Sequence, residues 1–371
     1  MDHYLDNAAT TRVCPEAADA AYQAMTEIYG NPSSTHAKGR EARKLLDQSR
    51  QAVADALGAK SASEVVFTSC GSESDNWAVL SGAESMRRMG SHIISSQVEH
   101  DAVRRSLDIL ESRGFSVTRL KPDHTGKILP EMVRDSLRED TVLVTLMMVN
   151  NETGAVTDIH SVSEVLRQKG SFALLHTDAV QAFKKIPFQA RTLGADLISV
   201  SGHKIHAPKG IAALYIRSGL KLKPLIVGGS QESERRAGTE PLPQISAFAA
   251  ACLQDARTEQ IRATKQLAVQ MLSETVPELR YLETEAPHIL SISMPGWRSE
   301  VLMNFLEGRN VYVSKSSACK QGRRSHVLEA LGLPSDVMDG ALRIGFSRYT
   351  SYSDLQALVE GLQAARNLAH R

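Results

Sequence analysis

Short apolar runs alternate with helical patterns between about residues 60 and 230, and this alternation constrains the fold more than any other feature. Runs of about five apolar residues, spaced by amphipathic helices, are typical of a mostly parallel sheet covered on both faces. The sequence therefore predicts a large α/β domain. The apolar runs are EVVFTS, HIISSQ, VLVTLMMVN, FALLHTD, DLISVS and GIAALYIR.

A long helical pattern follows, beginning near Ile245 and running through AFAAACLQDARTEQIRATKQLAVQML. It is too long for a helix that only covers a sheet, so we expect a single helix there that connects two domains. Beyond it, strand-like and helix-like patterns predict a second α+β unit of about 100 residues, an ordinary size for a domain. These patterns are HILSISM, SEVLMNFLEGRN, VYVS and SYSDLQALVEGLQAARNLAH.

The net charge, the N-terminal sequence and the cysteines indicate which binding partners and which cellular location to expect. A formal net charge of +1 gives no overall bias toward nucleic acid or an anionic membrane. The N-terminal MDHYLDNAATT does not resemble a secretory signal, and no run of 18 apolar residues occurs, so we expect a soluble cytoplasmic protein. Without Cys-x-x-Cys pairs or histidines at ligand spacing, we expect neither a disulfide framework nor a metal site. The four cysteines are Cys14, Cys70, Cys252 and Cys319.

Ligands of open parallel sheets bind beyond the carboxyl ends of the strands, so the residues that follow each apolar run are informative. In FTSCGSESDN, Gly71 and Ser72 open a helix whose free amides suit a phosphate. The alternative is a capping box with Ser72 as the N-cap. His100 and Asn151 follow two further runs, where an acid-base group and a hydrogen-bonding group would lie. Each of them also has an ordinary structural interpretation.

Asp178 and Lys204 follow the next two apolar runs and are 26 residues apart, about one strand-helix-strand step. The carboxylate and the amine can therefore face one crevice. A lysine in such a place is either a solvated loop residue or a Schiff-base former. A facing aspartate is what a pyridinium nitrogen needs.

Cys319 lies in the polar, basic stretch SKSSACKQGRR, residues 314 to 324. A cysteine kept for packing belongs among apolar neighbours, as Cys252 does in AFAAACL. The neighbouring Lys320, Arg323 and Arg324 would favour a thiolate, which is the nucleophilic form. Cys319 is therefore either a reactive nucleophile or an inert surface thiol.

Many motifs in one order give the chain a specific resemblance from residue 4 to residue 352. It resembles the cysteine desulfurases, which are class V aminotransferases among the fold-type-I enzymes that use pyridoxal 5'-phosphate (PLP), and it is closest to the first of their two groups. The resemblance implies an α/β fold with a mostly parallel seven-stranded sheet plus a smaller α+β domain. The large PLP-binding domain would span 15–250. The small domain, formed by 1–14 and 251–371, would carry the catalytic cysteine loop at about 314–327. The motifs are LDNAATT, GNPSSTH, VVFTSCGSESDN, VEHDAV, VNNETGAV, HTDAVQ, SGHKIHAPKGIAALY, RRAGTEP and SSAC.

The resemblance also implies roles around the cofactor. Lys204 would form the Schiff base with PLP, Asp178 would pair with the ring nitrogen, and His100 would lie on the ring face and transfer protons. The remaining cofactor contacts would come from Gly71, Ser72, Asn151, Gln181, Ser201, His203 and Thr239, the last reaching in from the second subunit of a homodimer.

The implied substrate is L-cysteine, gripped through its carboxylate by Arg343, with Asn31 and Asn151 beside it. Cys319 would attack the substrate sulfur, keep it as a persulfide and release alanine. The sulfur would then pass to an acceptor protein in iron-sulfur cluster assembly, tRNA thiolation or related sulfur traffic. No direct contact with nucleic acid or membrane is expected.

Departures and rival interpretations remain. Cys70-Gly71-Ser72 stands where relatives usually carry Gly-Ala-Thr, and the KQGRR after Cys319 is unusually basic.

Three other functions remain possible interpretations of the sequence. A selenocysteine lyase, or another PLP enzyme acting on cysteine, would need no persulfide. A true aminotransferase would give Cys319 no purpose. A catalytically silent dimeric scaffold would lack the absorption band of the bound cofactor.

Overall fold

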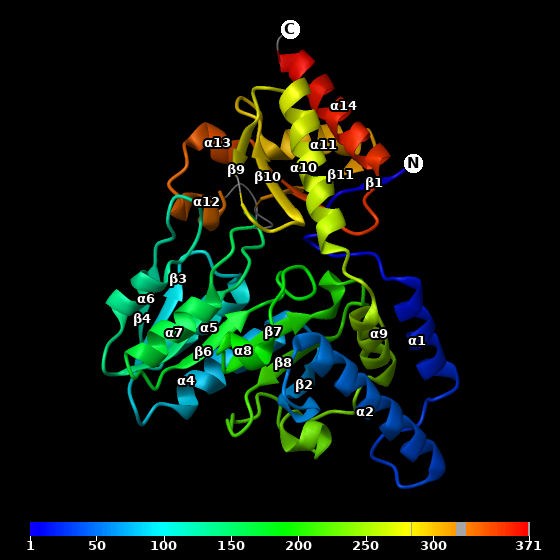
Figure 1. Cartoon of the computed structure of the whole chain (residues 1–371), viewed down its shortest axis with the longest axis vertical. Coiled ribbons are helices and arrows are strands. Elements are labelled where there is room, and N and C mark those ends of the chain that lie inside the picture. The colour runs from blue at the N-terminus through cyan, green and yellow to red at the C-terminus, as the bar shows by residue number, and fades with distance from the viewer. Residues whose placement is uncertain (283, 317–323, 370–371) are drawn as a thin grey trace.

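The computed structural model describes residues 1–282, 284–316 and 324–369, which form a broad lower part and a narrower upper part (Figure 1). Within these residues the lower part is built on a seven-stranded sheet. From edge to edge its strands are β2 (Val65–Thr68), β8 (Ala212–Ile216), β7 (Leu197–Ser201), β6 (Leu174–Asp178), β5 (Thr141–Met147), β3 (His92–Ser96) and β4 (Ser116–Leu120).

The sheet is mostly parallel, as predicted. Strand β8 runs antiparallel to β2 and to β7, and every other neighbouring pair is parallel. Six of the strands, all but β4, are buried along their whole length because they are covered on both faces. These six are the apolar runs of the sequence.

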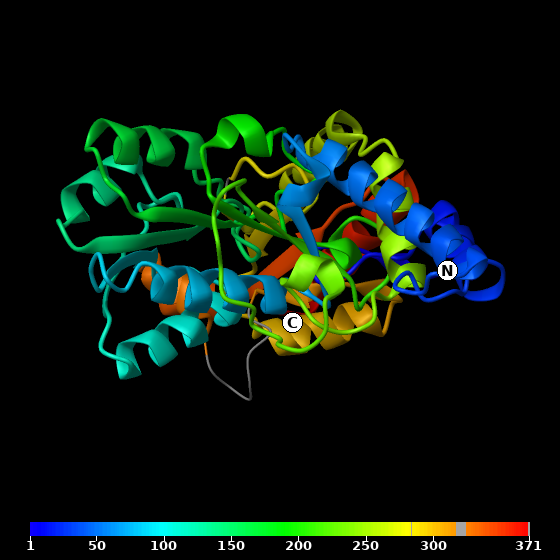
Figure 2. The same ribbon diagram turned by 90° about the horizontal axis from the view of Figure 1, so that it is seen from below.

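Helices cover both faces of this sheet (Figure 2). Alternate strand residues point to opposite faces, so Ile93 packs with α5 (Asp101–Ser112) while Ile94 belongs to the cluster that contains α7 (Ile159–Gln168). The face of α5 also receives one helical run, formed by α3 (Gly71–Asn76), a π-helical turn (Trp77–Ser81) and α4 (Gly82–Ser85). The face of α7 also receives α1 (Pro15–Thr26), α2 (Ala37–Leu57), α6 (Pro130–Ser136) and α8 (Ala190–Leu193).

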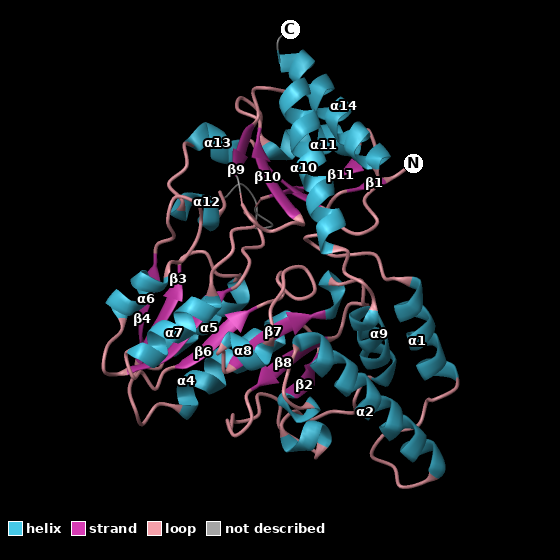
Figure 3. Cartoon of the chain, in the orientation of Figure 1, coloured by secondary structure: helices cyan, strands magenta, loops and turns pink. Residues whose placement is uncertain are grey.

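The upper part has its own sheets and its own hydrophobic core (Figure 3). Within the described residues an antiparallel sheet has the order β12 (Ser314–Lys315), β13 (Ala341–Gly345), β10 (Ile289–Ser293) and β9 (Arg280–Leu282). A parallel pair joins β1 (His3–Tyr4) to β11 (Val311–Tyr312). The helices of this part are α10 (Thr258–Thr275), α11 (Ser299–Glu307), α12 (His326–Ala330), α13 (Ser335–Asp339) and α14 (Tyr352–Ala369).

The prediction of one long connecting helix is wrong, because the chain breaks between α9 (Leu242–Leu253) and α10. Gln254 is extended, and Arg257 has a left-handed backbone with φ of 52°. The Asp255 carboxylate accepts the backbone N–H of Arg257 at 2.9 Å. An aspartate that bonds to a nearby amide in this way competes with helix formation, so the helical pattern is interrupted.

The N-terminal segment links the two parts. Backbone bonds join Leu5 and Asn7 to Gly345 of β13, and Thr11 to His203 just after β7. The domain limits at residues 14 and 250 stay a prediction. In the described ranges, no helix has both the length and the apolarity needed to cross a bilayer.

Candidate active site

The carboxyl ends of β5, β6 and β7 meet at one edge of the large sheet. Met147 at the end of β5 pairs with Asp178, which in turn pairs with Ser199 in β7. After β7 the chain makes a single 3-10 turn, Gly202–Lys204. The fold thus brings Asp178 and Lys204 to the same edge.

Lys204 is held by the N-terminal segment. Its Nζ donates to the backbone carbonyls of Ala8 at 2.8 Å and Ala9 at 2.6 Å. Burial, reinforced by the charge of Arg343, lowers the pKa of Lys204 to about 8, although Asp178 and Asp6 oppose the shift. The uncharged form of this amine is therefore much more populated near neutral pH than that of an ordinary lysine.

Asp178 is buried, and its Oδ1 accepts the backbone N–H of Val180 at 2.9 Å. Burial raises the pKa of Asp178, and the charges of His100 and Lys204 lower it only in part. His100 itself is exposed at the N-cap of α5, where its Nδ1 accepts the Ala102 N–H at 3.1 Å. The three residues thus lie within electrostatic range of one another.

Two further buried carboxyls, Asp75 and Glu99, lie near Asp178 and were not predicted. Burial, together with the charge of Asp178, raises the pKa of Asp75 well above its usual value and that of Glu99 to about 8. Glu99 accepts from Ser96 Oγ and from the Met147 N–H. Asp75 lies inside FTSCGSESDN and Glu99 inside VEHDAV, and these motifs are the only feature of the sequence that could have pointed to them.

The end of β7 and the start of α3 form a setting that suits a phosphate. The Ser201 hydroxyl is buried and has no hydrogen-bond partner within the described residues. Gly71 packs closely against Val180 and Ser201. A Cβ atom added at Gly71 would lie only 2.9 Å from Val180 Cγ2 and 3.7 Å from Ser201 Cβ. Burial and nearby lysines lower the pKa of His203 to about 4, so its ring is neutral.

The capping alternative for Ser72 is wrong, because the N-cap of α3 is Cys70, which makes no side-chain capping bond. Ser72 is exposed in the first turn of this helical run. An unpartnered buried hydroxyl, a neutral imidazole and a helix start are together the donors that a phosphate requires. These residues therefore fit the phosphate of PLP.

Gln181 is fixed between the two parts of the molecule. Its Nε2 donates to the Ala8 carbonyl at 2.8 Å, and its Oε1 lies 3.1 Å from His288 Nε2. His288 is fully buried just before β10 and was not predicted. Nothing local in its sequence distinguishes it, because only the three-dimensional fold brings it to Gln181.

Arg343 reaches the same place from β13. Its Nη1 donates to the Asn151 carbonyl at 2.8 Å, and its Nη2 lies 3.1 Å from Asp6 Oδ1. Its Nε is buried and has no partner in the described part of the chain. Asp6 was missed by the sequence interpretation although it stands inside LDNAATT. The guanidinium is thus oriented by two partners, and within the described ranges its Nε–H is left without one.

Two predicted residues lie on the surface. Asn31 is exposed in the segment between α1 and α2, and its Oδ1 accepts the Ser33 N–H at 2.9 Å. Thr239 is exposed just before α9. No contact among the described residues joins either of them to Lys204, so a role at the site would have to be exerted in another subunit or after a movement.

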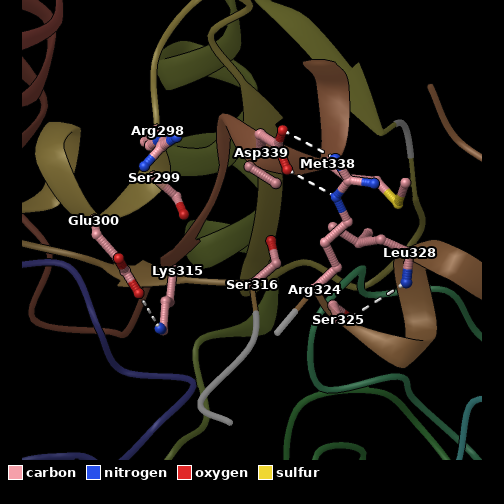
Figure 4. A pocket seen from close by; sticks show the side chains of 11 residues that line it. Arg298, Ser299, Glu300, Lys315, Ser316, Arg324, Ser325, Leu328, Met338 and Asp339 are labelled. Atoms are coloured by element: carbon pink, nitrogen blue, oxygen red, sulfur yellow. Dashed lines mark hydrogen bonds and ion pairs between the residues drawn. The ribbon is translucent and has the colours of Figure 1, made fainter. Parts of the chain in front are cut away.

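Cys319 lies outside the described residues, as do Lys320 and Arg323. On one side of this stretch, Lys315 pairs with Glu300 at 2.8 Å. On the other side, Arg324 forks onto Asp339, with Nε 2.8 Å from Oδ1 and Nη2 3.1 Å from Oδ2 (Figure 4). These residues line a pocket of about 490 Å³. The charge of Arg324 is thus partly neutralised by its ion pair with Asp339.

The other cysteines divide by burial. Cys14 and Cys252 are buried, and burial raises the pKa of both thiols. Burial of Cys252 confirms the expectation from its apolar helix. Cys70 is the one exposed cysteine of the described ranges.

Comparisons with known proteins place these residues in a family. The family model for class V aminotransferases matches residues 3–358. A cysteine desulfurase IscS from Methanosarcina thermophila is 37% identical, with 99% of this chain and 93% of that protein covered. A solved structure described as a NifS-like protein is 34% identical, with a TM-score of 0.93 and coverage of 99% of this chain and all of that one. The structure titled "SspA in complex with cysteine" is 32% identical, with a TM-score of 0.83 and coverage of 94% of this chain and 100% of that one.

Proposed function

The chain belongs to the class V aminotransferase family, among its cysteine desulfurases, and we propose that it converts L-cysteine to L-alanine and keeps the sulfur on Cys319 as a persulfide. The observation that carries this proposal is that Asp178 and Lys204 lie at one sheet edge, where the charges of Asp178 and of Arg343 from β13 both act on Lys204. An amine, an acid and a guanidinium within electrostatic range of one another suit an amino-acid substrate.

PLP is the cofactor that the site would hold. When bound, it supplies an electron sink for a carbanion at the substrate Cα. Lys204 would attach it, Asp178 would face its ring nitrogen, and His100 would lie on the ring face. The other cofactor contacts are proposed for Gly71, Ser72, Asn151, Gln181, Ser201, His203 and, from the partner subunit, Thr239.

Lys204 is also the proposed base. Because its pKa is lowered to about 8 by burial and by Arg343, the amine can take a proton from the substrate Cα near neutral pH. The Ala8 and Ala9 carbonyls hold the nitrogen in place. After proton uptake the ammonium would find the same two acceptors.

Arg343 is proposed to bind the substrate carboxylate. Its Nε has no partner within the described residues, and its Nη2 contacts Asp6. A carboxylate could take these two donors together in place of Asp6, which suits the fork of a guanidinium. Asn151 and Asn31 are proposed beside it.

Cys319 is the proposed nucleophile. Its thiolate attacks the substrate sulfur, so that an S–S bond forms while the C–S bond breaks. The electron pair of the broken bond stays with the carbon skeleton, which gains a proton and leaves as alanine. The neighbouring Lys320, Arg323 and Arg324 would favour the thiolate, and of these Arg324 is paired with Asp339.

A homodimer is proposed because one chain leaves the site incomplete. Both carboxylate oxygens of Glu240, the neighbour of Thr239, are buried and without partners in the described residues. Apolar side chains are exposed on α1 and just after it. Others are exposed in the segment leading toward Thr239, where Val227 is 80% exposed. A second copy would supply donors and cover these side chains. The exposed apolar residues are Tyr22, Met25, Tyr29, Leu225, Ile226 and Val227.

The sulfur acceptor is proposed to be another protein, in iron-sulfur cluster assembly, tRNA thiolation or related traffic. A persulfide needs a compartment in which thiols stay reduced, and this supports a cytoplasmic location.

The proposal is tested by supplying L-cysteine to the purified, PLP-loaded protein and measuring alanine and sulfide with a reductant present. Equal amounts of both products are expected. Amino transfer to a keto acid in place of alanine formation would contradict the proposal, and so would a protein that takes up no PLP.

The pH dependence of cofactor uptake gives a second prediction. In cofactor-free protein, the rate at which Lys204 reacts with PLP should rise as the pH increases through about 8. Only the uncharged amine reacts, and burial with Arg343 lowers the pKa of Lys204, so the free amine accumulates over this range. The product is trapped with borohydride and quantified by mass spectrometry. A short lysine peptide serves as the control, and a Lys204 profile that follows the peptide would contradict the lowered pKa.

A further inference from the structure

An ion pair joins the start of α3 to the loop that carries Thr239. Arg236 Nε lies 2.9 Å from Glu73 Oε1, and Arg236 Nη2 lies 3.2 Å from Glu73 Oε2. The Glu73 side chain is 9% exposed and that of Arg236 is 18% exposed. Two forks that meet in this way fix direction as well as distance.

Glu73 also holds the turn that precedes α3. Its Oε2 accepts the backbone N–H of Ser69 at 2.8 Å and the Ser69 hydroxyl at 2.5 Å. Burial raises the pKa of Glu73, but the hydrogen bonds from Arg236 and Ser69 outweigh burial and leave it below its usual value. Glu73 is thus an ionised anchor for Ser69, just before the helix that begins with Gly71 and Ser72.

The loop that carries Arg236 and Thr239 begins at a short 3-10 turn, Gln231–Glu234. This turn is the yellow-green one below β2 and β8 in Figure 1, and its contacts make it a rigid base for the loop. Glu232, Ser233 and Glu234 have left-handed backbones, with φ of 49°, 56° and 65°. Such residues persist only where their surroundings hold them. Glu232 is held by both Nη atoms of Arg50, at 2.6 and 2.8 Å, and by the Phe67 N–H at 3.0 Å.

Thr239 stands at the exposed end of this loop. Gly238 before it has φ of 111° and donates its N–H to Gln231 Oε1 at 3.1 Å. The loop is therefore tied to α2 and β2 through Glu232 and to α3 through Arg236. Thr239 is presented outward from a support fixed on two sides.

We propose that the Glu73–Arg236 pair is a positioning link between the two active sites of the homodimer. The inference rests on the proposed function, in which Thr239 completes the phosphate site of the partner subunit. One end of the pair holds a protomer's own phosphate turn, and the other end holds the loop that this protomer extends to its partner. Breaking the pair in one chain therefore weakens cofactor binding in both sites.

Mixed dimers test this link. Two differently tagged chains are combined, the cofactor is removed, and PLP is titrated back while its visible absorption is followed. With Arg236→Gln in one chain, both sites should bind PLP about tenfold more weakly, as expected when one partner of a largely buried pair is removed. Glu73→Gln should weaken both sites in the same way. Arg236→Lys keeps the charge but loses the two-pronged contact, so its PLP affinity should lie between those of the unchanged protein and Arg236→Gln.

A mixed dimer with Thr239→Val in one chain is the matched comparison, and it should contain one weakened and one normal site. Arg217→Gln, which breaks the Arg217–Asp196 pair at 2.6 Å, is the control and should leave both sites unchanged. Sedimentation would verify that each variant is a dimer.

A single weakened site, or none, in the Arg236→Gln mixed dimer would overturn the link while leaving the proposed function intact. If Thr239→Val changed neither site, the shared-site arrangement itself would be refuted, and the link with it.

Discussion

Replacing Lys204 with alanine is expected to abolish turnover of cysteine, with a loss of at least about 10³-fold, because the variant lacks both the cofactor attachment and the base. The visible absorption band of the attached cofactor should disappear as well. Alanine formation and the absorption spectrum of the purified variant measure the two effects.

Lys209→Ala is the matched control, since Lys209 is an exposed lysine in the same segment. It should keep both the band and the activity. If Lys204→Ala retained both, the assignment of Lys204 would be wrong. Loss of both in Lys209→Ala as well would point to damage of the segment rather than to loss of one amine.

Replacing Cys319 with serine is expected to stop sulfur transfer without disturbing the cofactor. The absorption band and the spectral change on adding cysteine should remain, because Lys204, Asp178 and Arg343 are untouched. Alanine production should fall by about 10³-fold or more, as for loss of an enzyme's nucleophile.

Cys70→Ser is the control for this variant, since Cys70 is exposed near the proposed phosphate turn. It should form persulfide and alanine. Alanine and sulfide formation that survives Cys319→Ser would favour a lyase that needs no persulfide.

Much of the large sheet could be predicted from the sequence because its strands are short apolar runs buried on both faces. Strand β4 could not, since it lies at the sheet edge and is mostly half-buried, so SVTRL carries no apolar run. The break between α9 and α10 was missed for a different reason. It depends on one side-chain bond from Asp255, which a helical pattern does not reveal.

The candidate site divides in the same way. Asp178 and Lys204 could be proposed because a parallel sheet brings successive strand ends to one edge. His288 could not, because it reaches Gln181 only through a contact between distant segments and resembles an ordinary structural residue in the sequence. Asp6 and Glu99 were overlooked although they lie inside the motifs LDNAATT and VEHDAV. The role of Cys319 rests on its polar, basic surroundings and on the family resemblance.

The most direct measurement of the central claim is the location of the sulfur after one turnover. The PLP-loaded protein is treated with L-cysteine without reductant, its thiols are alkylated, and its peptides are analysed by mass spectrometry. The account predicts one extra sulfur atom on the peptide that contains Cys319, formed together with alanine. An extra sulfur on Cys70, or alanine formed with no persulfide on any cysteine, would contradict it.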